Sequence, residues 1–151
     1  MSQAQPRPLT RRLALGVVAL VAALFGSLLV QTPALAVGCT WNGCNGKDPS
    51  VQGCGNDAVT LDEFTYGARF EMRYSAACHA VWTRVTSSVH YNTIFGQIRA
   101  YQNPSPPAVL VYGVQATEGQ HWTKMVSYSY WVKTCRAVWF DADPSECTAY
   151  H

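Results

Sequence analysis

Six cysteines constrain the fold of this chain more than any other feature of its 151 residues. All of them lie beyond residue 38, at Cys39, Cys44, Cys54, Cys78, Cys135 and Cys147. An even number of cysteines in a small exported protein is typical of a disulfide framework. The same number in a reducing compartment points instead to metal binding or catalysis, so the compartment decides how the cysteines are interpreted.

The amino-terminal 36 residues have the three zones of a secretion signal. A basic head without acidic residues precedes an apolar run over Leu13–Val30, and the small-residue stretch Ala34–Ala36 follows. This order is the one that a signal peptidase substrate requires. We therefore expect residues 1–36 to be a signal peptide that is cleaved after Ala36, and the remaining protein to be secreted and extracellular.

Three other forms of export remain open. An uncleaved anchor is conceivable, because a run of about 18 apolar residues just reaches the length that spans a bilayer. Lipidation of Cys39 is a second alternative, but it would leave five cysteines, an odd number that cannot all pair in disulfides. The pair Arg11-Arg12 begins a twin-arginine motif, but Ala14 stands where that motif favours an aromatic residue. Cleavage is favoured over the anchor, while the choice between the general and the twin-arginine route stays open.

Removal of the leader reverses the charge of the chain. The whole sequence has 11 basic and 9 acidic residues, but three of its arginines belong to the basic head, so residues 37–151 carry a net charge of −1. Proteins that bind nucleic acid normally carry a concentrated basic surface. We therefore expect no nucleic-acid partner, and no membrane association once the signal is cleaved.

In an extracellular chain the six cysteines are expected to form three disulfides. A zinc site is the competing interpretation, since Cys39 and Cys44 are close to ligand spacing, but no second CxxC or HxxxH completes it. Six cysteines allow 15 pairings, and we favour the local one, Cys39 with Cys44, Cys54 with Cys78 and Cys135 with Cys147, because short loops close easily. We accordingly expect neither a metal nor a cofactor.

Residues 37–151 are expected to form one domain with two parts. Residues 37–66 are rich in Gly, Asn, Asp and Cys, which favours turns and a disulfide-knotted loop region. From residue 67 onward apolar residues alternate with polar ones over about thirteen positions, to Trp82, which predicts a long half-buried strand with a bend near Ser75. Further strands are predicted at 93–101, 108–115, 123–132 and 134–140. The predicted fold is a small disulfide-stabilised all-β sandwich or barrel of antiparallel strands.

A short motif occurs twice in this β core. The Cys-x-Ala-Val-Trp sequence at Cys78–Trp82 recurs at Cys135–Trp139. In an extended chain its Cys, Ala and Trp lie on one face, so we expect Trp82 and Trp139 to be core residues. A duplicated binding unit is the alternative interpretation of the repeat.

No catalytic constellation is recognisable. Four histidines occur, but none lies in a known nucleophile or metal motif, and His79 is placed on the polar face of its strand. Acidic and amide residues cluster in two places, at Asp48, Asn56, Asp57, Asp62 and Glu63 and at Asp141, Asp143 and Glu146. Calcium binding by these loops and a glycosidase pair drawn from them both remain open. We expect a protein that is not an enzyme.

Aromatic residues are the strongest chemical signal. All five Trp and all eight Tyr lie beyond the leader, and secreted domains use such side chains to bind sugars or to anchor protein interfaces. The candidate binding residues are Trp41, Trp122, Tyr128 and Tyr130. The first hypothesis is a binding module with an extracellular protein partner, the second a carbohydrate or cell-wall binder, and the third a small secreted hydrolase or hydrolase inhibitor.

The cysteine framework also carries a resemblance to a known family. The segment from Cys39 through Gly46-Lys47-Asp48-Pro49 to Cys54, followed by Arg73-Tyr74-Ser75 and Cys78 up to Arg84, resembles the YjfA-like family of small exported Gram-positive proteins. That family is a domain of unknown function, so the resemblance assigns no catalytic residue. Its actinobacterial relatives look similar to adaptor subunits that join lectin and scaffold proteins in exported toxin particles, which implies an adaptor role.

Overall fold

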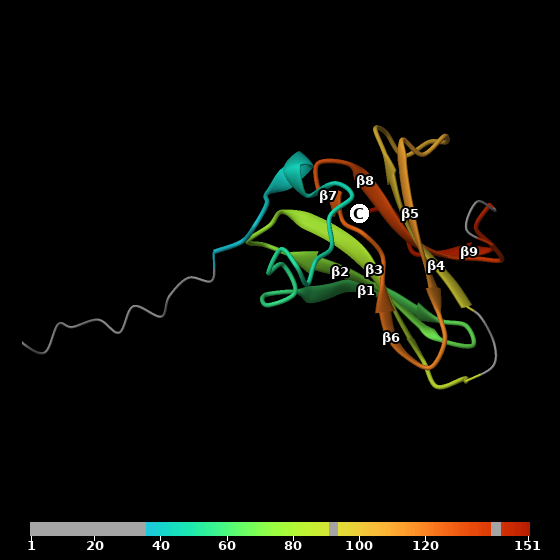
Figure 1. The fold of residues 1–151 in the computed structure, drawn as a ribbon. Coiled ribbons are helices and arrows are strands. Elements are labelled where there is room, and N and C mark those ends of the chain that lie inside the picture. Colours follow the sequence, from blue (N-terminus) through green and yellow to red (C-terminus); the bar gives the residue numbers. More distant parts are fainter. Residues whose placement is uncertain (1–35, 91–93, 140–142) are drawn as a thin grey trace, which may run out of the picture. The chain divides into compact units, whose positions relative to one another are not determined.

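The computed structural model describes residues 36–90, 94–139 and 143–151 (Figure 1). These residues belong to one compact unit that extends from Leu35 to His151. The predicted signal peptide, apart from its last residue, lies outside the described residues. No helix in the described part of the chain is long and apolar enough to cross a membrane.

The described chain forms two antiparallel sheets, which confirms the all-β prediction. Its elements are the 3-10 helix η1 (Trp41–Cys44) and the strands β1 (Val59–Thr65), β2 (Arg69–Ser75), β3 (Ala80–Ser87), β4 (Ile94–Tyr101), β5 (Leu110–Ala116), β6 (Gly119–Trp122), β7 (Val126–Ser127), β8 (Trp131–Ala137) and β9 (Glu146–Cys147). Sheet A has the order β1-β2-β3-β6, with β7 also pairing with β3, and sheet B has the order β5-β4-β8-β9.

The two sheets share a core, so of the two predicted folds, a sandwich or a barrel, the protein adopts the sandwich. Met72 and Val81 of sheet A lie in one buried cluster with Ile98 and Val132 of sheet B. The sheets approach closely at Gly96, where a Cβ atom would collide with Val85 of β3. Since only glycine lacks that atom, Gly96 permits the close approach.

The long strand predicted from residue 69 to Trp82 is wrong, because the chain reverses in its middle. β2 ends at Ser75 and β3 begins at Ala80, so the run forms a hairpin. Asp57 stabilises the turn: its Oδ1 accepts a hydrogen bond from Ser75 Oγ (2.5 Å) and its Oδ2 one from the amide of Ala77 (2.8 Å). The alternation does not continue across the turn, because Met72 of β2 lies in the sandwich core whereas Ala80 and Trp82 of β3 lie in a separate buried cluster.

The strands predicted near 93–101 and 108–115 are confirmed as β4 and β5. The strand predicted over 123–132 is wrong, because the chain leaves β7 on sheet A, turns, and enters β8 on sheet B. The predicted strand over 134–140 is the second half of β8. β1 lies largely within the segment expected to be loops, where a register shift between Thr60 and Asp62 breaks its alternation.

A second core lies outside the sandwich, beneath the amino-terminal segment, residues 37–58. It consists of buried cysteines and apolar residues from sheet A and its flanking loop: Cys44, Cys54, Cys78, Ala80, Trp82 and Met125. Trp82 belongs to this second core and is only 4% exposed, as predicted. Trp139 is 67% exposed, so the prediction that it is buried is wrong. The repeated motif is therefore not a repeated structure: Cys78 lies in a turn and Cys135 in a strand.

Candidate binding site

Three disulfides hold the amino-terminal and carboxyl-terminal parts of the unit. They join Cys39 to Cys44, Cys54 to Cys78 and Cys135 to Cys147, with separations of 5, 24 and 12 residues. This is the local pairing that the sequence favours.

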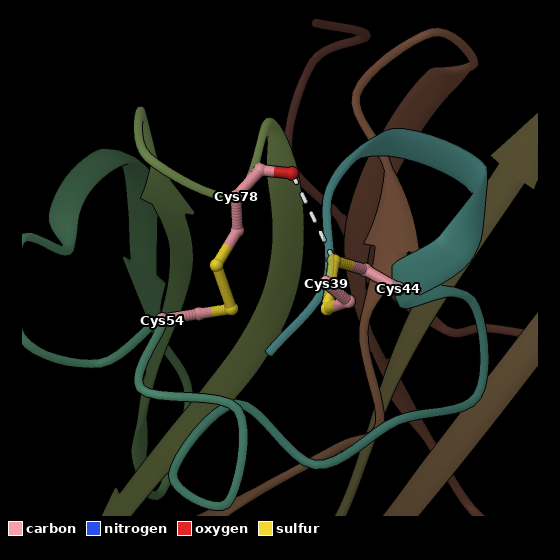
Figure 2. Close-up of side chains that lie close together, drawn as sticks. All are labelled: Cys39, Cys44, Cys54 and Cys78. Atoms are coloured by element: carbon pink, nitrogen blue, oxygen red, sulfur yellow. Dashed lines mark hydrogen bonds between the residues drawn. A yellow bond between two sulfur atoms is a disulfide. The ribbon is translucent and has the colours of Figure 1, made fainter. Parts of the chain in front are cut away.

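Two of these disulfides lie side by side (Figure 2). The four Sγ atoms of Cys39, Cys44, Cys54 and Cys78 lie within 4.8 Å of one another and are buried. Cys44 Sγ also contacts the carbonyl oxygen of Cys78 at 3.8 Å. Four converging thiolates would be the ligand set of a structural zinc site, but a sulfur bound in a disulfide has no thiolate to offer. The Cys54–Cys78 disulfide instead attaches the amino-terminal segment to the turn between β2 and β3 of sheet A, and the Cys39–Cys44 disulfide closes a loop within that segment.

The attached amino-terminal segment forms one side of a pocket. Pro49, Ser50, Gly55, Asn56 and Ala58 of the amino-terminal segment line it on one side. The outer face of sheet A supplies the rest: Arg73 from β2, Trp82 and Arg84 from β3, and Gln120 and Trp122 from β6. The volume is about 290 Å³. Arg73 pairs with Trp82 across β2 and β3, and Arg84 with Trp122 across β3 and β6, so these side chains share one face.

A buried ion pair underlies this pocket. Arg84 donates from Nε and Nη2 to the two carboxylate oxygens of Glu71, at 2.7 Å each. Glu71 is 1% exposed and also accepts a hydrogen bond from Thr60 Oγ1 at 3.1 Å. Burial by itself would raise the pKa of Glu71, but the hydrogen bonds and positive charge of Arg84 outweigh it and lower that pKa. Glu71 therefore neutralises Arg84.

Arg73 donates its two hydrogen bonds to neutral groups. Its Nη1 donates to Thr60 Oγ1 at 2.6 Å and its Nη2 to the carbonyl oxygen of Ala58 at 2.5 Å. No carboxylate in the described part of the chain lies within 4 Å of its guanidinium. Burial and then the charge of Arg84 lower the pKa of Arg73 against the attraction of Glu71, and Arg73 still remains charged at neutral pH. The pocket thus contains one cation without a bound counter-charge.

Trp122 lies at the pocket in a restrained orientation. Its indole is 39% exposed, and Nε1 donates to Asp48 Oδ1 at 3.4 Å. The same Asp48 oxygen accepts the backbone amide of Ser50 at 2.9 Å, and Lys124 Nζ lies 3.7 Å from Oδ2. A restrained, partly exposed indole beside hydrogen-bonding groups is suited to binding a flat ligand.

The other three predicted binding residues lie elsewhere. Trp41 is 46% exposed and stacks on the His79 ring at 4.1 Å. Tyr128 packs against Tyr74 at 4.7 Å, and Tyr130 is partly buried against the sandwich core. Of the four, only Trp122 belongs to the pocket.

Sequence reasoning missed Arg73, Arg84 and Gln120 as site residues, and it considered Asn56 only within the acidic cluster for calcium. The signal for the first was present, since Arg69, Glu71 and Arg73 are the polar members of the alternating run. Nothing in the sequence places Asn56 or Gln120 beside them, because each comes from a different part of the chain.

The histidines form no acid–base pair in the pocket. His79 Nδ1 lies 3.5 Å from the Tyr74 hydroxyl, and His121 Nε2 lies 3.2 Å from the backbone oxygen of Glu118. His151 does approach Asp62 at 3.1 Å, and His90 contacts Glu118. No member of these two pairs lines the pocket.

The predicted acidic clusters do not converge. Within the described ranges, the only group of metal-ligand residues whose donor atoms converge is the set of four cysteines. Asp48 and Asp57 are occupied by backbone and side-chain donors of nearby turns. Asp143 lies 3.9 Å from Arg99, and Asp141 lies outside the described residues.

A family model described as a protein of unknown function, DUF2690, matches residues 42–138. The matched segment contains every residue that lines the pocket. No curated protein and no solved structure matches the chain.

Proposed function

We propose that the chain, which belongs to the DUF2690 family of proteins of unknown function, is an exported, non-catalytic binding module whose ligand lies on the outer face of sheet A. The pocket beside Trp122 is the single observation that carries this proposal. It combines an oriented, partly exposed indole with the charged group of Arg73 and the amides of Asn56 and Gln120. Export rests on the sequence of residues 1–36, and the YjfA-like resemblance is a proposal of the same kind.

The shape of the site favours a carbohydrate or cell-wall polymer over a folded protein at this face. A stable protein interface buries about 800 Å² on each partner, whereas a concave site with one aromatic platform and a few convergent polar groups suits a small or chain-like ligand. Sugar rings present an apolar face to an indole and hydroxyl groups to side-chain amides. The pocket provides both kinds of group.

A non-catalytic role is supported by the side chains around the pocket. Among the residues that the structure describes, the two histidines with the best prospects as a base, His79 and His121, bind no carboxylate, and neither lines the pocket. Asp48, the carboxylate nearest Trp122, is occupied by Trp122 itself and by the turn it stabilises. A hydrolase would need an acid or base within reach of the bound ligand.

Retention on insoluble cell wall tests the proposal. Trp122→Ala should weaken retention of the purified secreted protein by about tenfold, because the aromatic platform is lost. Trp41→Ala is the matched control, since Trp41 is at least as exposed as Trp122 but lies outside the pocket, and it should leave retention unchanged. Equal retention of the wild type and Trp122→Ala would contradict the proposal.

An adaptor role is the second candidate function, and the other sheet favours it. Sheet B and the residues after β8 expose large apolar side chains: Val111 40%, Trp131 46%, Val138 53% and Trp139 67%. Exposed Trp side chains are typical anchors of protein interfaces. A stoichiometric protein captured from culture fluid, and lost with Trp139→Ser but not with Trp122→Ala, would support the adaptor role that the YjfA-like resemblance implies.

A further inference from the structure

We propose that the pocket selects acidic sugars, with Arg73 binding the carboxylate and Trp122 contacting the sugar ring that carries it. This inference rests on the proposed function and names the ligand class of the same site. The charge balance of the pocket, the hydrogen-bond donors that Arg73 retains and the position of Trp122 support it.

The charge balance of the pocket is positive. Arg84 and Glu71 form a bidentate pair that cancels, and Arg69, 3.5 Å from Glu71, lies outside the pocket lining. Arg69 is itself paired with Glu63, while Arg73 has no such partner within the described residues. Glu71 attracts Arg73 through space but makes no direct ion pair with it. Burying a charge without a directly paired counter-charge is costly, so a partly buried Arg73 favours a ligand that brings a negative group.

Arg73 retains donors for such a group. A guanidinium has five N–H donors in a planar fork, and the two hydrogen bonds of Arg73 go to Thr60 and Ala58. These two contacts also restrain the side chain on the face of sheet A, so less entropy is lost when a ligand binds. The remaining N–H groups of the fork match the two oxygens of a carboxylate.

The aromatic residues favour a ligand whose acid group is attached to, or lies next to, a sugar ring. Arg73 pairs directly with Trp82 in the strand register, and Trp122 lines the same pocket of about 290 Å³. A linear anion would leave the exposed indole without a contact. A sugar ring that carries a carboxylate satisfies both groups and offers hydroxyls to Asn56 and Gln120, which also line the pocket.

Matched polymers test the acid requirement without any mutation. Binding of the secreted protein to a polyuronic acid should be at least about tenfold tighter than binding to the same polymer after its carboxyl groups are reduced to alcohols. Binding to the acid form should also weaken as salt rises, because the ion pair is only partly buried. Equal affinity for the two polymers would overturn the inference while leaving the proposed function intact.

Variants of Arg73 test the residue. Arg73→Gln should weaken binding to the polyuronic acid by about 10- to 100-fold, and Arg73→Lys by less, because lysine keeps the charge but loses the fork. Arg69→Gln is the matched control on the same strand and face, outside the pocket lining, and should change affinity less than about twofold. Circular dichroism verifies that each variant is folded, and the polymer comparison stands if Arg73→Gln fails to fold.

The outcomes separate the two proposals. Tight binding only to a glycerol-phosphate polymer would overturn the acidic-sugar assignment but retain a wall ligand. Binding to neutral glycans that is lost with Trp122→Ala but unaffected by Arg73→Gln would do the same. No binding to any wall glycan or to insoluble wall would overturn the proposed function itself.

Discussion

The two ends of the described unit are attached in different ways. The amino-terminal segment has η1 as its only regular element and reaches sheet A through scattered backbone hydrogen bonds, such as those from Trp41 to Cys78 (2.8 Å) and from Gly46 to Met125 (3.0 Å). The carboxyl-terminal segment, residues 143–151, continues sheet B. β9 pairs with β8, and His151 exchanges two backbone hydrogen bonds with Val132 (3.0 and 3.1 Å).

The comparison shows that a disulfide can hold a segment that lacks strand pairing. In the amino-terminal segment the sulfurs are themselves the core, since Cys44, Cys54 and Cys78 are completely buried around Trp82 and Met125. In the carboxyl-terminal segment the disulfide adds one cross-link to a ladder that already exists. Only the first of the two segments lines the pocket, so the region that depends on disulfides is also the one we assign to binding.

Removal of the Cys54–Cys78 disulfide should have the largest effect. In the Cys54→Ala, Cys78→Ala variant the free energy of unfolding should fall by about 3.5 kcal/mol from loop entropy alone, given the separation of 24 residues, and further from the lost core volume. Thermal unfolding should show a Tm lower by about 10 °C or more. Retention on cell wall should be lost. Full retention would show that the pocket does not need this disulfide to bind its ligand.

Removal of the Cys135–Cys147 disulfide should cost less. Loop entropy for a separation of 12 residues sets an expected loss of about 3 kcal/mol, and the hydrogen bonds of β9 and His151 to β8 preserve the attachment. Urea unfolding of the Cys135→Ala, Cys147→Ala variant measures the loss. Wall retention should equal that of the wild type, and a stability loss exceeding that of the Cys54 and Cys78 variant would reverse the comparison.

Acid should loosen sheet A before sheet B. Burial opposes the charge of Glu71, but Arg84 lowers its pKa below the ordinary 4.5, so this carboxylate stabilises the fold above that pH. That contribution is lost as the pH falls below about 4.5 toward the lowered value. Glu71→Gln should lower stability at pH 7 by about 2 kcal/mol and flatten the acid side of the stability curve.

Hydrogen exchange locates that effect. Between pH 7 and pH 3, amides of β2 and β3 should lose more protection than amides of β8 and β9. Uniform loss across both sheets would show that Glu71 does not determine the acid response.

Loss of the turn contact at Asp57 should have the smallest effect. Asp57→Asn weakens the hydrogen bonds from Ser75 Oγ and the Ala77 amide, which should lower stability by about 1 kcal/mol. Ser145→Ala is the matched change in the carboxyl-terminal segment, since it removes the hydrogen bond from Arg136 Nη1, and it should cost less because the backbone ladder of β9 remains. Urea unfolding of both variants compares them, and a larger loss for Ser145→Ala would contradict this order.

Much of the fold could be predicted from residues that act locally. Short spacing favours the three disulfide pairs, alternation predicts the strand that became β2, and the strands near 93–101 and 108–115 became β4 and β5. Trp122 was identifiable because it lies close to the turn-forming sequence Thr117-Glu118-Gly119-Gln120. The turn inside the run from residue 69 to Trp82 was not, because the side chain that stabilises it, Asp57, lies 18 residues before Ser75.

The sequence by itself determined the chemistry of this protein: its even set of cysteines, its alternating strands and its excess of aromatic residues. Only the tertiary structure decided which of these residues meet. Four sulfurs converge because β2 and β3 form a hairpin whose turn contacts η1, and Arg73, Arg84 and Trp122 share a pocket because three strands pair in one register. Alternation fixes the face of a residue within its strand, but the neighbours on that face depend on pairing between distant segments.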